Sequence, residues 1–176
     1  MLGANDGIVS TASLVVGVAA SGAARGEVLV AGAAGLVATL AAKRLRASFD
    51  EPGSPAATLT MLDQFAAAWN RHDVDGLMAC MAPECAFETA AGKDVNGTRH
   101  VGPDAVRRAY AAVFETYADA RWNHPAHFVA GDRAVSEWTF SGTTKDGTKV
   151  EMNGCDIFTL QGGKIALKNS YRKQRG

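Results

Sequence analysis

An aspartate inside an apolar stretch is the residue of this sequence with the clearest chemical potential. Asp156 stands between Cys155 and Ile157 in a segment whose composition predicts a buried strand. A buried carboxyl group is costly unless it accepts hydrogen bonds or keeps its proton, and one that keeps its proton can transfer it beside a carbonyl group. Asp156 is therefore the first candidate catalytic residue. The competing interpretation is a structural carboxylate at a pocket mouth, held by an arginine or by backbone donors.

Two further candidates come from the strands predicted on either side of this segment. His124 and His127 are three positions apart, which places them on opposite faces of a regular strand, although Pro125 between them indicates a bulge or an edge strand. The histidine pair is therefore a poor metal site, and His127 is instead a candidate acid or base in a pocket. Asn169 and Tyr171 share one face of the last strand, and Tyr171 is the third candidate catalytic residue.

Aromatic residues are placed where they could line a pocket around the aspartate. Alternation puts Trp138 and Phe140 on one face of their strand, and Met152, Gly154, Asp156 and Phe158 on one face of the next. Gly154 would leave room for a ligand beside Asp156, unless it only marks a bend in the strand. Ordinary core packing is the alternative explanation for the aromatic side chains. The residues expected to line the pocket are Trp69, Trp138, Phe140, Phe158, Met152 and Asn169.

The elements that must position these residues begin with two helices. Ser54 can cap a helix that has Pro55 at its first position, and apolar residues then recur at helical spacing until a break at 70–73. A short second helix is expected to end at Pro83, and a short strand to cover 85–89. Gly102 and Pro103 open a third helix.

The rest of the chain reads as four strands over 121–130, 134–144, 150–160 and 165–171. Turn sequences at 131–132, 146–147 and 162–163 separate them, which is typical of hairpins. The predicted fold is α+β with the order α-α-β-α-β-β-β-β, a curved antiparallel sheet wrapped on helices as a cone. Lys168, Arg172, Lys173 and Arg175 are expected to form a solvated basic end of the chain.

Several stretches resemble a known superfamily. Residues Phe65–Leu77 resemble the opening helix pair of the nuclear transport factor 2-like superfamily, and Gly131–Thr143 and Gly154–Ile165 resemble its SnoaL-like branch. The resemblance spans about residues 55–176 and implies the cone fold. In SnoaL-like cyclases an aspartate matching Asp156 is the general acid or base. The superfold also hosts isomerases, hydrolases and non-enzymatic binders, so the fold alone does not decide the function.

An isomerase function can be tested by comparing this sequence with the catalytic residues of the related steroid isomerases. The resemblance places Thr89 where those enzymes carry a base carboxylate, and Phe65 where they carry an oxyanion-binding tyrosine. Isomerase activity of that type is therefore not expected, because the paired oxyanion hole would be lost. A cyclase-like or hydrolase-like proton transfer, and a non-catalytic binding module, both stay open.

The first 45 residues differ in composition from the rest. Only Asp6, Arg25 and Glu27 are charged before Lys43, and uncharged runs cover 8–24 and 28–42. As helices these runs would span about 25 and 22 Å, somewhat short of the ~30 Å hydrocarbon core of a bilayer. They predict an apolar helical hairpin, truncated but membrane-associated, with a cytoplasmic domain behind its basic end.

Residues Gly3–Leu14, continued at 17–20, resemble the start of the vacuolar iron transporter family, which carries ferrous or manganous ions through membranes. The resemblance implies a metal-path role for Asp6, provided that this leader is functional. It stops near residue 38, before the other metal-binding segments of that family. A membrane tether or a fusion relic is therefore expected in place of a working transporter.

Composition excludes several other classes of protein. Eighteen basic and 18 acidic residues give a net charge of zero, which argues against a nucleic-acid partner. Three cysteines without paired spacing argue against a disulfide framework or a zinc site, and no cofactor is expected. The predicted organisation is a leader over 1–45, a linker over 46–54 and a domain over 55–176. The expected partners are a small molecule and a second copy of the chain.

Overall fold

The computed structural model describes residues 36–43 and 51–173 of the chain, which divides into two compact units, 1–50 and 51–176. The boundary falls inside the predicted linker. Residues 36–43 are helical, and Leu36, Val37 and Leu40 are exposed there. No helix in these two described ranges is long and apolar enough to cross a membrane. The remainder of the predicted apolar hairpin, including Asp6, lies outside the described residues.

The second unit opens with two helices whose ends are capped as the sequence predicts. Helix α3 (Pro55–Arg71) starts where the Ser54 hydroxyl accepts a hydrogen bond from the Ala57 N–H at 3.2 Å, with Pro55 in the first turn. It ends at His72, which has a left-handed φ of 56°. Helix α4 (Val74–Ala79) starts at Asp73, whose carboxylate accepts from the Gly76 N–H at 2.8 Å.

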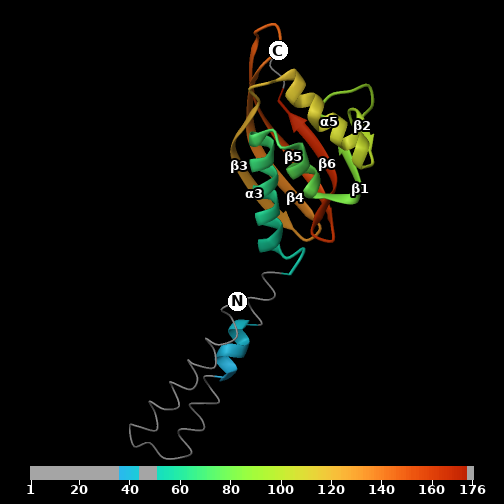
Figure 1. Ribbon diagram of the computed structural model, residues 1–176. Helices are drawn as coiled ribbons and strands as arrows, with labels where there is room; N and C mark the ends of the chain where they lie inside the picture. The colour runs from blue at the N-terminus through green and yellow to red at the C-terminus, as the bar shows by residue number, and fades with distance from the viewer. Residues whose placement is uncertain (1–35, 44–50, 174–176) are drawn as a thin grey trace, which may run out of the picture. The chain divides into compact units, whose positions relative to one another are not determined.

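Six strands follow and form one curved sheet. They are β1 (Met81–Glu88), β2 (Arg99–Val101), β3 (Arg121–Ala130), β4 (Arg133–Thr143), β5 (Lys149–Gln161) and β6 (Lys164–Arg172), with helix α5 (Pro103–Thr116) between β2 and β3. The strand order is β2-β1-β6-β5-β4-β3, in which only the β1–β6 pair is parallel. Helices α3 and α5 lie over one face of this sheet (Figure 1).

The predicted α+β class and the four-strand meander are confirmed, with β3 at the predicted bounds. The meander turns carry glycines with positive φ, at 61° for Gly131 and 87° for Gly147, which other residues rarely adopt. Two local predictions were wrong. A short strand, β2, precedes α5, and the second helix ends at Ala79 rather than at Pro83. Pro83 instead lies exposed in β1, where the register against β6 is irregular and no ladder N–H is needed.

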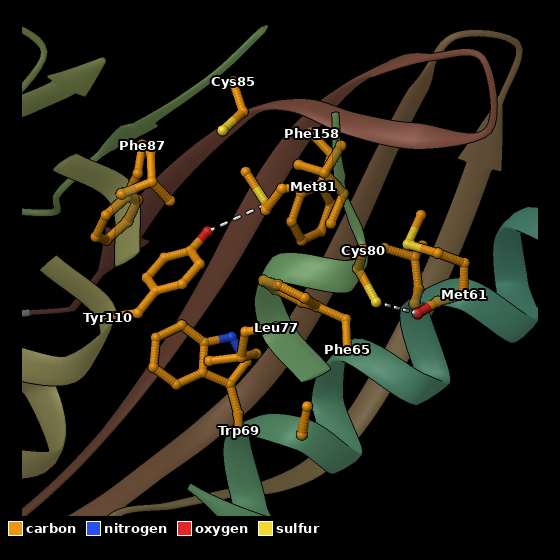
Figure 2. Close-up of a cluster of buried hydrophobic side chains, with 14 of the residues drawn as sticks. Met61, Phe65, Trp69, Leu77, Cys80, Met81, Cys85, Phe87, Tyr110 and Phe158 are labelled. Carbon is orange, nitrogen blue, oxygen red and sulfur yellow. Dashed lines mark hydrogen bonds between the residues drawn. The ribbon is translucent and has the colours of Figure 1, made fainter. Parts of the chain in front are cut away.

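A cluster of aromatic side chains fills part of the space between helices and sheet (Figure 2). The ring centroids of Trp69 and Tyr110 are 4.8 Å apart, and those of Phe65 and Phe158 are 6.0 Å apart. The Tyr110 hydroxyl lies 3.5 Å from the Met81 sulfur, so that even this polar group is satisfied inside the core. Of these rings, Trp69 also borders the interior cavity described below.

Candidate functional site

The strand register brings four polar residues into one row across the inner face of the sheet. His127 of β3 pairs with Ser136 of β4, Ser136 pairs with Asp156 of β5, and Asp156 pairs with Ser170 of β6. Directly paired residues project to the same side of a sheet. The row therefore lies on the side covered by the helices.

Asp156 is buried and accepts three hydrogen bonds from side chains. Its Oδ1 atom accepts from Lys168 Nζ at 2.7 Å and from Ser170 Oγ at 2.6 Å, and its Oδ2 atom accepts from Trp138 Nε1 at 3.0 Å. The carboxylate is thus both paired with a cation and hydrogen-bonded, as a buried charge must be. The sequence-based prediction of a buried carboxyl group at this position holds, but the partner is a lysine instead of an arginine.

Lys168 is the partner that sequence reasoning missed. Its side chain and that of Asp156 are each only 6% exposed, so it does not belong to a solvated basic end. Its Nζ atom also lies 2.5 Å from Ser170 Oγ, 4.6 Å from the Phe87 ring centroid and 5.6 Å from that of Trp69. The two ring faces add cation–π attraction to the ion pair.

A one-residue irregularity in the β5–β6 hairpin explains the miss. Leu160 pairs with Ile165 but Thr159 pairs with Leu167, so Ala166 is an extra residue and the register shifts by one. Such a shift exchanges the two faces of the strand beyond it. Lys168 and Ser170 consequently face the helices. Counting from the glycine turn alone cannot detect the bulge.

The same shift corrects two predicted site residues. Asn169 and Tyr171 lie on the outer face of β6, away from Asp156, where the Asn169 side-chain amide donates to the Tyr171 hydroxyl at 3.1 Å. Neither residue lines the inner cavity. Phe128 of β3 is also exposed on this outer face. The second copy of the chain that the sequence analysis expects as a partner stays a prediction.

A cavity of about 380 Å³ lies between the inner face of the sheet and α5. Four of the residues predicted to line a pocket do line it: Trp69, Trp138, Phe140 and Met152. Phe158 does not, because it is completely buried in the aromatic core. Most of the cavity wall is apolar. Its polar lining residues include His100, Thr89, Lys168, Ser170 and Arg172.

Asp156 does not line this cavity. Lys168, Ser170 and Trp138, its three hydrogen-bond partners, all do. Asp156 borders only a void of about 20 Å³ together with His127 and Ser136. A ligand in this inner cavity would therefore meet the lysine and serine directly, and the aspartate only through them.

Gly154 has a different use from the one expected. A Cβ atom at this position would lie 2.3 Å from the Trp138 ring and 2.5 Å from the Tyr171 carbonyl oxygen. The missing side chain thus leaves room for the indole of Trp138. That placement is what allows the Trp138 N–H to reach Asp156.

His127 packs beneath α3 and does not line the inner cavity. Its Nδ1 lies 2.7 Å from Ser136 Oγ, and its Nε2 lies 3.4 Å from the Asp63 carboxylate without hydrogen-bond alignment. Burial lowers the pKa of His127 below its ordinary value of 6.5, and the charge of Asp63 opposes only part of that effect. His124 lies in a bulge at Asn123–Ala126 with φ of 54°, as the neighbouring proline indicates. Among residues 36–43 and 51–173, no group of histidine, cysteine and acidic side chains is arranged to hold a metal ion.

Comparison with known families agrees with this architecture. The family profile of the SnoaL-like domain matches residues 62–168. The chain belongs to the SnoaL-like domain family. The matched segment includes His127, Ser136, Asp156 and Lys168, and Ser170 lies two positions beyond its end.

Solved structures with the same fold are distant in sequence. A candidate polyketide cyclase from Xanthomonas campestris pv. campestris is 18% identical with a TM-score of 0.58, and covers 65% of this chain and 89% of its own. A nuclear transport factor 2-like protein of unknown function from Mesorhizobium loti is 27% identical with a TM-score of 0.55, covering 67% and 92%. A candidate isomerase from Bacillus subtilis is 14% identical with a TM-score of 0.58, covering 66% and 86%. These likenesses establish the fold.

The leader of the SnoaL-like protein is similar to a second family. The profile of the VIT family matches residues 1–42. Vacuolar iron transporter homolog 1 of Oryza sativa subsp. japonica is 63% identical over 38 residues, which are 22% of this chain. The aligned segment spans only 16% of the length of that relative.

Replacing Gly154 with alanine should destabilise the domain by about 1–3 kcal/mol, because the added methyl group displaces the Trp138 indole. Urea unfolding of the full chain measures the effect. In a Trp138→Phe background the penalty should shrink, because the smaller ring leaves room. An equal penalty in both backgrounds would show that Trp138 is not the neighbour that matters.

The stability of the domain should fall as the pH is lowered below about 6.5, because the unfolded chain then protonates His127 while the folded chain resists it. The slope is at most about 1.4 kcal/mol per pH unit, and the loss ends below the folded-state pKa. The lowered pKa values of Asp73, Asp119 and Asp146 act in a separate window, below their ordinary 3.8.

Unfolding free energies measured between pH 7.5 and pH 5 test this prediction. His127→Asn should flatten the slope over that range. His124→Asn is the matched control, since asparagine tolerates the positive φ of that exposed position. Equal slopes in the two variants would contradict the assignment to His127.

Proposed function

We propose that the SnoaL-like domain binds a small, mostly apolar carbonyl compound in its inner cavity and promotes a proton transfer next to the carbonyl group. The observation that carries the proposal is the buried Lys168–Asp156 pair, whose lysine borders a cavity of about 380 Å³ with aromatic walls. Cavities of this size that combine apolar walls with a few convergent polar groups are typical ligand sites. Family membership agrees with this proposal but leaves the substrate open.

The chemistry follows from the residues that line the cavity. The ammonium group of Lys168 would donate to the carbonyl oxygen and stabilise negative charge that develops on it. Ser170 accepts from Lys168 and donates to Asp156, so it would hold that ammonium group in place. His100 is the imidazole in the same wall, stacked on Phe87 with ring centroids 5.9 Å apart. It would accept the proton from the carbon beside the carbonyl. The electron pair of that C–H bond then forms a C=C bond, while the π pair of the C=O bond moves onto the oxygen to give an enolate.

A thermal-shift screen of the full chain against flat aromatic ketones and quinones tests binding, because a ligand that binds the folded state raises the melting temperature. Ala112→Trp should reduce the affinity for any hit at least tenfold, since Ala112 lies on α5 in the cavity wall and is exposed. Ala67→Trp adds the same group to an exposed position of α3 outside the cavity, and should bind like the wild type. Equal binding by both variants would place the ligand elsewhere.

Proton transfer is tested separately. The wild-type chain should accelerate deuterium exchange at the carbon beside the carbonyl of a bound ketone, followed by NMR in D₂O. His100→Gln should slow that exchange without loss of binding. Binding without any accelerated exchange would leave a binding protein instead of an enzyme.

A second proposal concerns the leader, and it is supported by the 63% identity over 38 residues to a vacuolar iron transporter homologue. We infer that residues 1–42 tether the domain to a membrane, with the domain on the cytoplasmic side. The segment covers too little of the transporter to argue for transport. The full chain should sediment with membranes and resist alkaline carbonate extraction.

An arginine in the first apolar run should release the protein, because a charge at the centre of a membrane helix costs about 2.5–3.5 kcal/mol. Val16→Arg is such a variant, and Val95→Arg, in a fully exposed loop position, is the control. Extraction of the wild-type chain by carbonate would overturn the tether.

A further inference from the structure

The floor of the cavity is formed by Lys168, Ser170 and Trp138, the three lining residues that hydrogen-bond with Asp156. Its balance of charge supports an inference about ligand selection, which rests on the proposed function. Lys168 is the only basic residue of the cavity wall that the structure describes as buried; Arg172 is exposed and His100 is half-buried. Because Asp156 lies 2.7 Å from the ammonium group, the two charges cancel within the floor. The floor thus presents a polar donor without a net charge.

The geometry leaves one donor on this lysine for a ligand. An ammonium group has three N–H bonds. One is directed to Asp156 Oδ1 at 2.7 Å, and a second to Ser170 Oγ at 2.5 Å. The hydroxyl of Ser170 is itself used, since it donates to Asp156 at 2.6 Å. The third N–H of Lys168 is therefore the donor with which the floor can meet an oxygen of the ligand.

We propose that Lys168 is the ligand-contacting cation of the cavity and that Asp156 is a positioning residue that cancels its charge, so that the site selects uncharged oxygen-bearing ligands over carboxylates. A carboxylate seated on the floor would bring a charge that the buried ammonium group does not compensate, because Lys168 is already paired with Asp156. An uncharged ketone gives up one hydrogen bond to water and regains one from Lys168. Negative charge is then tolerated only when it develops during reaction, directly beside the ammonium group.

A matched pair of probes tests this selection in the full chain. 2-Acetylnaphthalene and 2-naphthoate have nearly the same shape and differ in charge. The wild-type protein should bind the ketone at least tenfold more tightly than the carboxylate at pH 7.5, measured by isothermal titration calorimetry. Ala112→Trp should weaken both, which locates the binding in the cavity.

Asp156→Asn should reverse the preference, because it leaves the charge of Lys168 uncancelled at the floor. Affinity for 2-naphthoate should rise at least tenfold, while affinity for the ketone changes little. Asp104→Asn removes the same charge from an exposed position outside the cavity, and should leave both affinities unchanged. In the double variant Asp156→Asn/Lys168→Met, the carboxylate should gain nothing and the ketone should bind more weakly.

Different failures have different meanings. If neither probe binds the wild type and no ketone in the thermal-shift screen does, the proposed function and this inference fall together. If 2-naphthoate binds the wild type as tightly as the ketone, the inference is overturned while the proposed binding function stands. That comparison needs no variant, so it holds even if Asp156→Asn does not fold.

Discussion

A buried ion pair between Lys168 and Asp156 is the interaction on which the arrangement of the inner face depends. Transferring both charges from water into the domain costs several kcal/mol per ion, and the attraction offsets this only with good geometry and further hydrogen bonds. The domain provides both: a contact of 2.7 Å, donors from Ser170 and Trp138, and two aromatic rings near the ammonium group. Hydrophobic residues of similar volume would often be at least as stable, so stability alone is a weak explanation for the pair. A role at the cavity wall is a better one.

The backbone sets up this pair through two local departures from regular structure. The extra residue at Ala166 turns Lys168 and Ser170 toward the helices. Because Gly154 has no side chain, the Trp138 indole lies over it and its N–H reaches Asp156 on the neighbouring strand. Both are single-residue features, and each changes which groups meet at the floor of the cavity. The site is therefore a product of register as much as of residue type.

This dependence explains what could be predicted from the sequence. Helix caps at Ser54, hairpin glycines and alternating strands are local signals, and they gave the α+β class and most element bounds. Burial of Asp156 also followed from its apolar neighbours. The partner of Asp156 could not be predicted. Whether Lys168 or Asn169 faces Asp156 depends on a bulge, and no residue type between Thr159 and Leu167 indicates that bulge. Strand β2 was missed for a similar reason, since three residues carry too little periodicity.

The burial of Asp156 behind its partners also limits the chemistry that it can perform. An acid or base must come within hydrogen-bond reach of the proton that it moves. Lys168, Ser170 and Trp138, the partners of Asp156, line the cavity, and the carboxylate itself does not. A proton from a ligand could reach Asp156 through the hydroxyl group of Ser170, because that hydroxyl borders the cavity and donates to Asp156 at 2.6 Å. A proton taken from a ligand by that hydroxyl could pass to the carboxylate only if Lys168 kept its own charge without the counterion. The ion pair that positions the ammonium group therefore opposes use of the aspartate as a base. This is why the proposed proton transfer uses His100, which lines the cavity itself.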